Sequence, residues 1–319
     1  MTKKTVIIAV SVVALIALTY FAYVKIKKAL TYADASPTSI PIDEAPTMVI
    51  DVFKLEETEG LNSEWMLTAQ KAEMFKKSGR IIFNKVDATV NGDAQGKTNY
   101  KINSDQGAYI IDEDKIILEK NVVITTSQGY KIITEMLEYY SKSKKINTPL
   151  PVSVSGKSPS GQVLNIDGVG ISGDLGTGDF KIAKKISTKL GPKLEISSEK
   201  AEFNTNSNKV IFEKDITAKK DGLDIKGEKL VVSYSSTGEI KNIEVSDGVK
   251  IKIGKKYALC DHALIKGGSS EVVLTGKPEF HAGRDVMVGQ KIVFFADSDE
   301  VYVEKVKAEV TEDSVRKKK

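Results

Sequence analysis

The stretch that decides the fold is WMLTAQKAEMFKKSGRIIFNKVDATV, residues 65–90. Trp65, Leu67 and Ala69 alternate with the residues between them, which is the period of two that a half-buried strand requires. The run KKSG supplies a polar turn, with a glycine for an unusual dihedral angle. A β-branched and aromatic run, IIFNKVDATV, then returns. The stretch therefore predicts strands joined by a polar turn.

The same pattern recurs along the rest of the chain with a period of about 30 residues, which is typical of a repeat architecture. Clear copies begin at Tyr100, Tyr130, Lys193, Gly222, Lys256 and Asp285, and a weaker copy begins at Val163. One such unit cannot bury its apolar face alone, so neighbouring units must stack on each other. The sequence therefore predicts an elongated, all-β protein.

The composition is that of an ordinary folded protein. Hydrophobic residues make up 41% of the 319 residues and charged residues 28%, which argues against a disordered chain. The 47 basic and 43 acidic side chains nearly balance, and no basic run is interleaved with aromatic residues. This pattern does not indicate a nucleic-acid-binding protein, although it is compatible with a mildly anionic ligand.

Residues 5–24, TVIIAVSVVALIALTYFAYV, carry no charge and are long enough to cross a bilayer core of about 30 Å. Tyr20 and Tyr23 lie near the far end, where interfacial aromatic residues are common. The alternative is a cleaved signal peptide with small residues 33–35 as its cleavage site. However, the apolar run is longer than a usual signal core, and three lysines separate it from that site. We therefore expect residues 1–28 to be an uncleaved anchor with the body outside the cytoplasm.

The remainder of the chain divides into a linker, two similar halves and a tail. Residues 29–47 hold three of the eight prolines and are expected to form a linker. The sequence KLGP at 189–192 interrupts the strand pattern just after a glycine-rich stretch. We interpret this interruption as the seam between two β-rich modules, residues 48–190 and 191–310. A basic tail, residues 311–319, follows them and is expected to fray.

Residues that could carry catalysis are scarce. The chain has one cysteine and two histidines, and CDH at 260–262 suggests a nucleophile, a carboxylate and a base. On a strand, however, Cys260 and His262 would share one face with Asp261 on the other, so the three could not form a local relay. His281 has no partner at metal-ligand spacing, and no phosphate-binding loop, zinc-protease or dinucleotide motif is present. We therefore expect no catalytic residue, no metal and no cofactor.

Apolar side chains at alternate strand positions are the main positive signal. We expect the following residues to face the interior and to line a groove for an apolar ligand: Leu67, Ala69, Ala108, Ile110, Ile132, Ile196, Phe203, Ile225, Leu259 and Val288. Small residues recur at matching places in several repeats, which favours a groove over a filled core. An ordinary sandwich core remains the alternative at any single position. Gly168 and Gly173 are expected to be structural, at a bend or a close backbone approach.

The order of the motifs behind the apolar N-terminal segment resembles that of a known family. LTAQKAEMF, INSDQGAY and IITEMLEY follow one another as in the LptC family of lipopolysaccharide-export proteins. The resemblance covers roughly residues 1–190 and includes the glycine-rich segment 168–188. Residues 191–310, with ISSEKAEF, IKGEKLVV and LCDHALI, are similar to the LptA, or OstA-like, domain.

This resemblance implies a fold and a role. It implies two twisted β-jelly rolls in tandem behind one transmembrane helix, with an apolar interior that holds lipid A acyl chains. It also implies an inner-membrane protein whose periplasmic body takes lipopolysaccharide from an ABC transporter. The first strand, residues 49–55, would meet the transporter, and the last, residues 301–310, would meet an LptA-like component or the outer-membrane translocon. This chain departs from the family pattern because it carries both modules, and the fusion would replace one non-covalent joint.

Two other functions stay open at this point. A β-solenoid that binds polysaccharide would require clustered carboxylates on one face. A purely structural envelope tether would have a solid core and would bind no lipid.

Overall fold

The structure is a computed structural model, and it describes residues 44–59, 62–92, 98–157, 163–191, 193–305 and 307–309. The predicted anchor at 1–28, nearly all of the predicted linker at 29–47 and the tail at 311–319 lie outside the described residues. Within the described ranges, no helix is long and apolar enough to cross a membrane. The described strands all belong to one compact unit, Pro46–Lys319.

Antiparallel strands account for most of the described chain, together with one 3-10 turn, η1 (Ile111–Glu113). The first half forms β1 (Met48–Glu59), β2 (Asn62–Phe75), β3 (Arg80–Asn91), β4 (Asn99–Ile110), β5 (Lys115–Thr126), β6 (Lys131–Tyr140), β7 (Lys145–Lys157), β8 (Val163–Asp174) and β9 (Asp179–Leu190). The second half forms β10 (Leu194–Ser198), β11 (Lys200–Asn204), β12 (Lys209–Lys220), β13 (Leu223–Tyr234), β14 (Ile240–Ile253), β15 (Lys256–Lys266), β16 (Glu271–Thr275), β17 (Glu279–Ala282), β18 (Asp285–Val288), β19 (Lys291–Phe295), β20 (Val301–Glu304) and β21 (Lys307–Glu309). The prediction of an all-β fold is confirmed.

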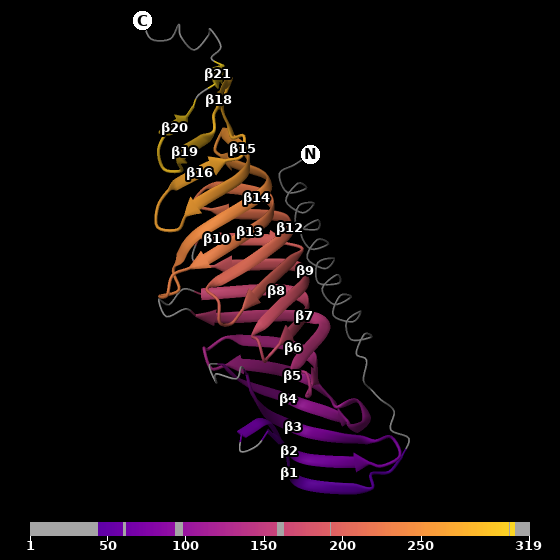
Figure 1. Cartoon of the computed structure of the whole chain (residues 1–319). Helices are drawn as coiled ribbons and strands as arrows, with labels where there is room; N and C mark the ends of the chain where they lie inside the picture. The colour runs from indigo at the N-terminus through magenta and orange to yellow at the C-terminus, as the bar shows by residue number, and fades with distance from the viewer. Residues whose placement is uncertain are drawn as a thin grey trace, which may run out of the picture. The chain divides into compact units, whose positions relative to one another are not determined.

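The strands pair in the order in which the chain makes them. From β1 to β9, each strand pairs antiparallel with the next. β9 and β12 both pair with β10 and with β11, so these two short strands share one place in the ladder. β12 to β15 then continue strand by strand. Figure 1 shows this succession from indigo β1 to the yellow strands at the C-terminal end.

Beyond β15 the sheet divides into two arms. One end of β15 pairs with β16, which is followed by β19 and β20, and we call this the β16 arm. The other end of β15 pairs with β17, which is followed by β18 and β21, and we call this the β17 arm. The two arms therefore continue the two ends of one long strand.

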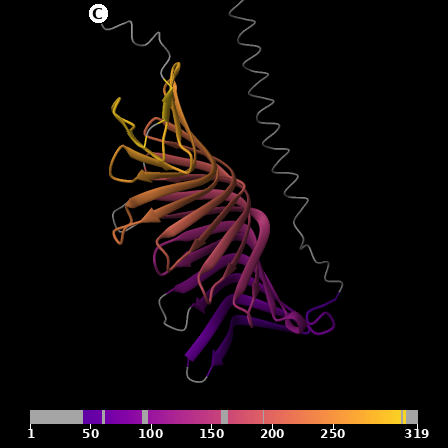
Figure 2. The same ribbon diagram turned by 45° about the horizontal axis from the view of Figure 1, so that its top comes forward.

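The long strands bend near their middle, and the bends lie in register. In the pairing of β4 with β5 the register shifts between Asn103 and Gln106, and similar shifts occur in most later pairs through β14 and β15. Left-handed backbone marks the same line, as at Asn121 (φ 54°) and Asp215 (φ 48°). Such bulges bend a strand and increase its twist. Because they stack from strand to strand, the sheet curves along one line (Figure 2) and forms the twisted β-jelly roll that the resemblance implied.

The inner side of the bent sheet holds one continuous apolar cluster, from Trp65 to Phe294. At the predicted seam the cluster is not interrupted. Phe180 of β9 stacks on Phe203 of β11 with ring centroids 5.2 Å apart, and Tyr100 of β4 lies 6.3 Å from Phe180. The aromatic contacts therefore join the two halves of the chain in a single core.

Two glycines of β8 make room for this core. A Cβ at Gly173 would lie 2.5 Å from Phe180 Cδ1, and a Cβ at Gly168 would lie 2.5 Å from Ile182 Cγ2. Both distances are shorter than any tolerable contact between carbon atoms. The glycines therefore let the side chains of β9 pack directly on the backbone of β8.

Candidate functional site

The apolar inner face is the first feature with functional potential, and it contains most of the residues that the sequence placed there. Leu67, Ala69, Ile132, Ile196 and Ile225 are all buried members of the cluster. Phe203 is half-buried and packs against it. These side chains come from β2, β6, β10, β11 and β13, so they extend across both halves of the chain.

Ala108 is buried, but Ala108 and Ile110 lie on the face of β4 opposite the apolar cluster, which corrects the prediction that they face the groove. Their neighbour Tyr109 packs against the core and pairs with the core residues Ile81 and Ile116. Opposite a bulge in β5, the inward series of β4 changes from even-numbered to odd-numbered residues. Alternation counted through the bulge is therefore out of phase by one residue.

Leu259 and Val288 also lie on the opposite face from the core. Both are paired with Glu279, whereas the inward residues Ala258 and Met287 are both paired with Phe280. Opposite a bulge in β14, the inward series of β15 changes phase between Cys260 and Ala263, so alternation counted from the other end of the strand is again out by one residue. The inward residues at these two places are Ala258 and Met287.

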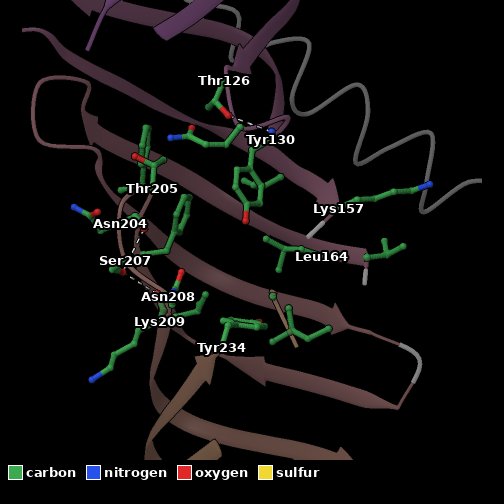
Figure 3. A pocket seen from close by; sticks show the side chains of 18 of the residues that line it. Thr126, Tyr130, Lys157, Leu164, Asn204, Thr205, Ser207, Asn208, Lys209 and Tyr234 are labelled. Carbon is green, nitrogen blue, oxygen red and sulfur yellow. Dashed lines mark hydrogen bonds between the residues drawn. The ribbon is translucent and has the colours of Figure 1, made fainter. Parts of the chain in front are cut away.

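A cavity of about 410 Å³ opens at the edge of the inner face, where the two halves of the chain meet. We call it the seam cavity. Its apolar part consists of Ile132, Val154, Val163, Leu164, Phe180, Leu190, Phe203 and Val210. Its polar part includes Thr126, Gln128, Tyr130, Lys157, Asn204, Thr205, Ser207, Asn208, Lys209, Tyr234, Ser235 and Ser236. Figure 3 shows most of these side chains, which project from strands and turns on both sides of the cavity.

Two tyrosines, Tyr130 and Tyr234, lie on the polar side of the seam cavity. The ring of Tyr130 lies against Gly156, where a Cβ would come within 2.4 Å of Tyr130 Cδ1. The hydroxyl of Tyr234 is buried, and within the described part of the chain no protein atom forms a hydrogen bond with it. Burial raises the pKa of Tyr234 well above the usual tyrosine range, and nearby Tyr130 raises it further. The Tyr234 phenol is therefore protonated at neutral pH and can donate a hydrogen bond.

Polar bonds connect the two halves beside this cavity. Gln128 Nε2 donates to Thr98 Oγ1 at 2.6 Å, and Thr98 Oγ1 donates to Asn206 Oδ1 at 3.4 Å. Asn204 Nδ2 donates to Asp179 Oδ1 at 2.7 Å, and this bond is the largest cause of the lowered pKa of Asp179. The mouth of the cavity is thus fixed by side chains from both halves.

The residues considered for catalysis do not form a site. Cys260 is buried, and its burial raises its pKa to about 11, so the reactive thiolate is disfavoured. The sequence predicted that Cys260 and His262 share one face, but β15 changes phase here, opposite a bulge in β14, and His262 lies on the outer face instead. His281 stacks on Tyr257 and lies 3.1 Å from Glu279. In the described ranges, no three His, Cys, Asp or Glu side chains gather closely enough to hold a metal.

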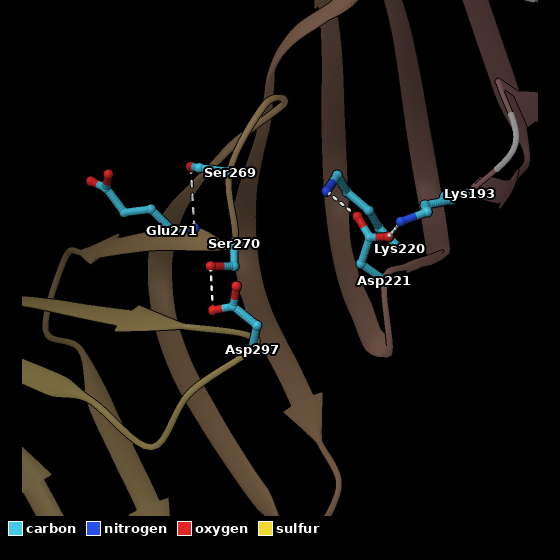
Figure 4. Close-up of polar contacts among 7 residues, drawn as sticks. All are labelled: Lys193, Lys220, Asp221, Ser269, Ser270, Glu271 and Asp297. Carbon is cyan, nitrogen blue, oxygen red and sulfur yellow. Dashed lines mark hydrogen bonds and ion pairs between the residues drawn. The ribbon is translucent and has the colours of Figure 1, made fainter.

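Among the described residues, the charged side chain of Lys220 lies on the inner face. Lys220 is buried opposite the core residues Leu194 and Leu223, and its Nζ is 2.6 Å from Asp221 Oδ2. Lys193 binds the other oxygen of Asp221 at 3.0 Å, as Figure 4 shows. The hydrogen bond from Lys220 is the largest cause of the lowered pKa of Asp221. This ion pair satisfies the buried amine at the strand end.

Each half of the chain matches the model of a known protein family. Residues 10–190 match the family model described as lipopolysaccharide-assembly, LptC-related. Residues 195–300 match the model described as LptA/(LptD N-terminal domain) LPS transport protein. No curated protein matches the chain significantly.

One solved structure similar to part of the chain is LptH of Pseudomonas aeruginosa, described as the LptA-homologous periplasmic component of a lipopolysaccharide transport device. It shares 9% identity over 37% of this chain and 94% of its own length, with a TM-score of 0.35. The LptC-related match covers more than half of the 319 residues. The chain therefore belongs to the LptC-related family of lipopolysaccharide-assembly proteins, and it carries an LptA-like segment behind the LptC-like one.

Proposed function

We propose that the inner face of this protein binds the acyl chains of lipopolysaccharide and passes them from the β1 end of the sheet to the β21 end. The observation that carries this proposal is the continuous apolar cluster from Trp65 to Phe294, which joins the LptC-like and LptA-like halves. A lipid that moved along it would meet similar side chains at each step. The family to which the chain belongs handles this same lipid.

The energetics are compatible with movement along the inner face from one strand to the next. Burial of one CH₂ group contributes about 0.8 kcal/mol, so a chain of about a dozen carbons would gain roughly 10 kcal/mol before any costs. Because the inner face repeats, this gain would be nearly constant from one position to the next. Net direction would then come from work done by another component, and the protein itself would need no catalytic residue. We accordingly propose a non-enzymatic role.

The inner face must open to accept a lipid. Leu67, Ile132 and Ile225 expose no more than 2% of their surface, so the two sides of the bent sheet are in contact around them. Entry of an acyl chain would require these sides to part. The seam cavity is a place where apolar surface is already accessible, and we propose that it is one point of entry or exit.

The ends of the sheet are the proposed contacts with other components. Within the described residues β1 pairs only with β2, and its exposed side chains include Met48, Val49 and Val52. An unpaired edge of this kind can accept a strand from a partner. We propose that β1 meets an ABC transporter in the inner membrane and that β20 and β21 meet an LptA-like protein or the outer-membrane translocon. Residues 5–24 would anchor the chain, with the body in the periplasm.

We also propose that the body functions as two modules, residues 48–190 and 191–310. The place where β9 pairs with both β10 and β11 supports this division, because a single strand is replaced there by two short ones. Fusion of the modules would keep the second half of the route permanently next to the first.

The test is photo-crosslinking to lipopolysaccharide in export-competent membranes. A photoreactive residue would replace Ile132, Ile225 or Met287 on the inner face, and Leu259 or Val288 on the outer face as matched controls. We expect ATP-dependent adducts at the three inner positions and none at the two outer ones. Adducts at no inner position, in a folded protein, would rule out the route and leave a structural tether. Equal adducts on both faces would show nonspecific contact.

A further inference from the structure

The seam cavity contains polar groups that an apolar route does not need. The Tyr234 hydroxyl and the Thr205 Oγ are both buried, and neither has a hydrogen-bond partner among the described residues. Both side chains line the cavity. A buried hydroxyl without a partner is costly, and each case in a folded protein requires an explanation.

The surroundings of Tyr234 restrict what could be that partner. The tyrosine packs against the core cluster at the end of β13, and the stacked rings of Phe180 and Phe203 line the same cavity. Figure 3 shows the hydroxyl of Tyr130 pointing into this space. The cavity volume of about 410 Å³ lies in the range of ligand pockets. A suitable ligand is therefore mostly apolar and carries an oxygen part of the way along its length.

We propose that the seam cavity selects an acyl chain that carries a hydroxyl group, and that the Tyr234 hydroxyl donates a hydrogen bond to that oxygen. The proposal rests on the proposed function, because the chain must first enter the inner face. The ligand hydroxyl would in turn donate to a hydroxyl oxygen of the cavity, for which Tyr130 and Thr205 are the candidates. A fully saturated, unsubstituted chain would leave these groups unpaired.

Selection follows from the chemistry of such a site. A pocket built to hydrogen-bond a substrate hydroxyl rejects the analogue without it, because its own polar groups stay buried and unpaired. Burial holds the Tyr234 phenol in its protonated form, so the donor is present throughout the neutral pH range. The preference would therefore be independent of pH near neutrality.

The test compares two fatty acids of equal length, one with a hydroxyl group near the carboxyl end and one without. Their binding to the full chain in nanodiscs is measured by displacement of a fluorescent fatty acid. We expect the hydroxylated acid to bind about tenfold more tightly than the unsubstituted one. Tyr234→Phe should remove this preference by weakening the hydroxylated acid alone.

Tyr139→Phe is the matched control. The Tyr139 hydroxyl is also buried without a partner among the described residues, but Tyr139 packs on Trp65 and does not line the cavity. This variant should keep the preference. Thr205→Val is the second cavity variant, to be used if Tyr234→Phe does not fold, and it should reduce the preference.

Three outcomes would overturn the inference. Equal binding of the two acids by the unaltered protein would show that the cavity does not select. The same loss in Tyr139→Phe and Tyr234→Phe would show an effect of stability instead of contact. Binding of neither acid would contradict the proposed function as well, whereas the first two outcomes leave that function intact.

Discussion

The two sides of the sheet are held together in one way from β2 to β9 and in another way beyond β15. Strands β2 to β9 are 10–14 residues long, and bend at most of their pairings, so covalent backbone joins the two sides of the sheet. Beyond β15, strands of 3–5 residues build two separate arms. The β16 and β17 arms meet through side chains, such as Phe280 and Phe294 with ring centroids 5.3 Å apart. We therefore expect β2 to β9 to stay closed and the two arms beyond β15 to separate more easily.

The largest expected effect is in the region of long strands. Phe83 of β3 is fully buried, and its ring centroid lies 5.4 Å from the ring centroid of Phe53. Phe83→Ala should lower the free energy of unfolding by about 3–5 kcal/mol, because it removes a large side chain and leaves a cavity. Chemical denaturation would measure this loss. If β2 to β9 form one cooperative unit, amide exchange should accelerate across all of them together.

A core truncation between the arms should act locally. Phe294→Ala removes the β16-arm half of the aromatic contact, at a cost of about 3 kcal/mol within that region. We expect amide exchange to accelerate in β16 to β20 while β2 to β9 keep their protection. Hydrogen exchange with mass spectrometry resolves the two regions. Equal acceleration in both would contradict the distinction between them.

Overpacking at β8 should have a smaller effect. Gly173→Ala places a methyl group 2.5 Å from the Phe180 ring and 3.2 Å from Ile146, so the ring must move. We expect a loss of about 1–3 kcal/mol in the free energy of unfolding. Gly176→Ala provides a control in the following turn, where the nearest atom to a Cβ is a side-chain oxygen of Asp174 at 3.1 Å. Unchanged stability of Gly173→Ala would show that Phe180 is free to shift.

The smallest effect concerns Cys260, which lies in β15 just before the division into arms. The folded state holds the thiol proton more tightly than the unfolded chain, with a pKa of about 11 against 9.0. The contribution of Cys260 to stability is therefore full below pH 9 and is lost as the pH rises through 11. Alkylation at pH 8.5 should be slow in the unaltered protein and faster in Phe294→Ala, where the arms separate. Mass spectrometry after timed alkylation would measure both rates.

The sequence predicted the strands, their repetition and the family resemblance, because these depend on alternation and motif order along the chain. Leu67, Ile132, Ile196 and Ile225 were placed on the correct face for the same reason. Ala108 was misplaced because β4 changes phase opposite a bulge in β5, and nothing in the composition of β4 marks that change. The left-handed Asn121 hints at such a bulge, since asparagine tolerates that conformation better than most residues.

The seam cavity could not be predicted in this way. Its two tyrosines, Tyr130 and Tyr234, are far apart in the chain, and their proximity depends on how β6 to β13 are stacked. Each tyrosine looks like an ordinary strand-end residue in its own repeat. Only the three-dimensional arrangement shows that a buried hydroxyl from one half lines the same space as an aromatic ring from the other.

The strictly sequential pairing of β1 to β9 also bears on how such a protein could grow. A gene duplication that inserts one hairpin, that is, two adjacent strands, would lengthen the ladder by about 10 Å. The inserted pair would keep the alternation of direction, so every downstream strand would still present its apolar side inward. Insertion of a single strand would reverse the direction of everything after it. Changes in reach are therefore expected to occur in steps of two strands, and relatives should differ in length by multiples of one hairpin.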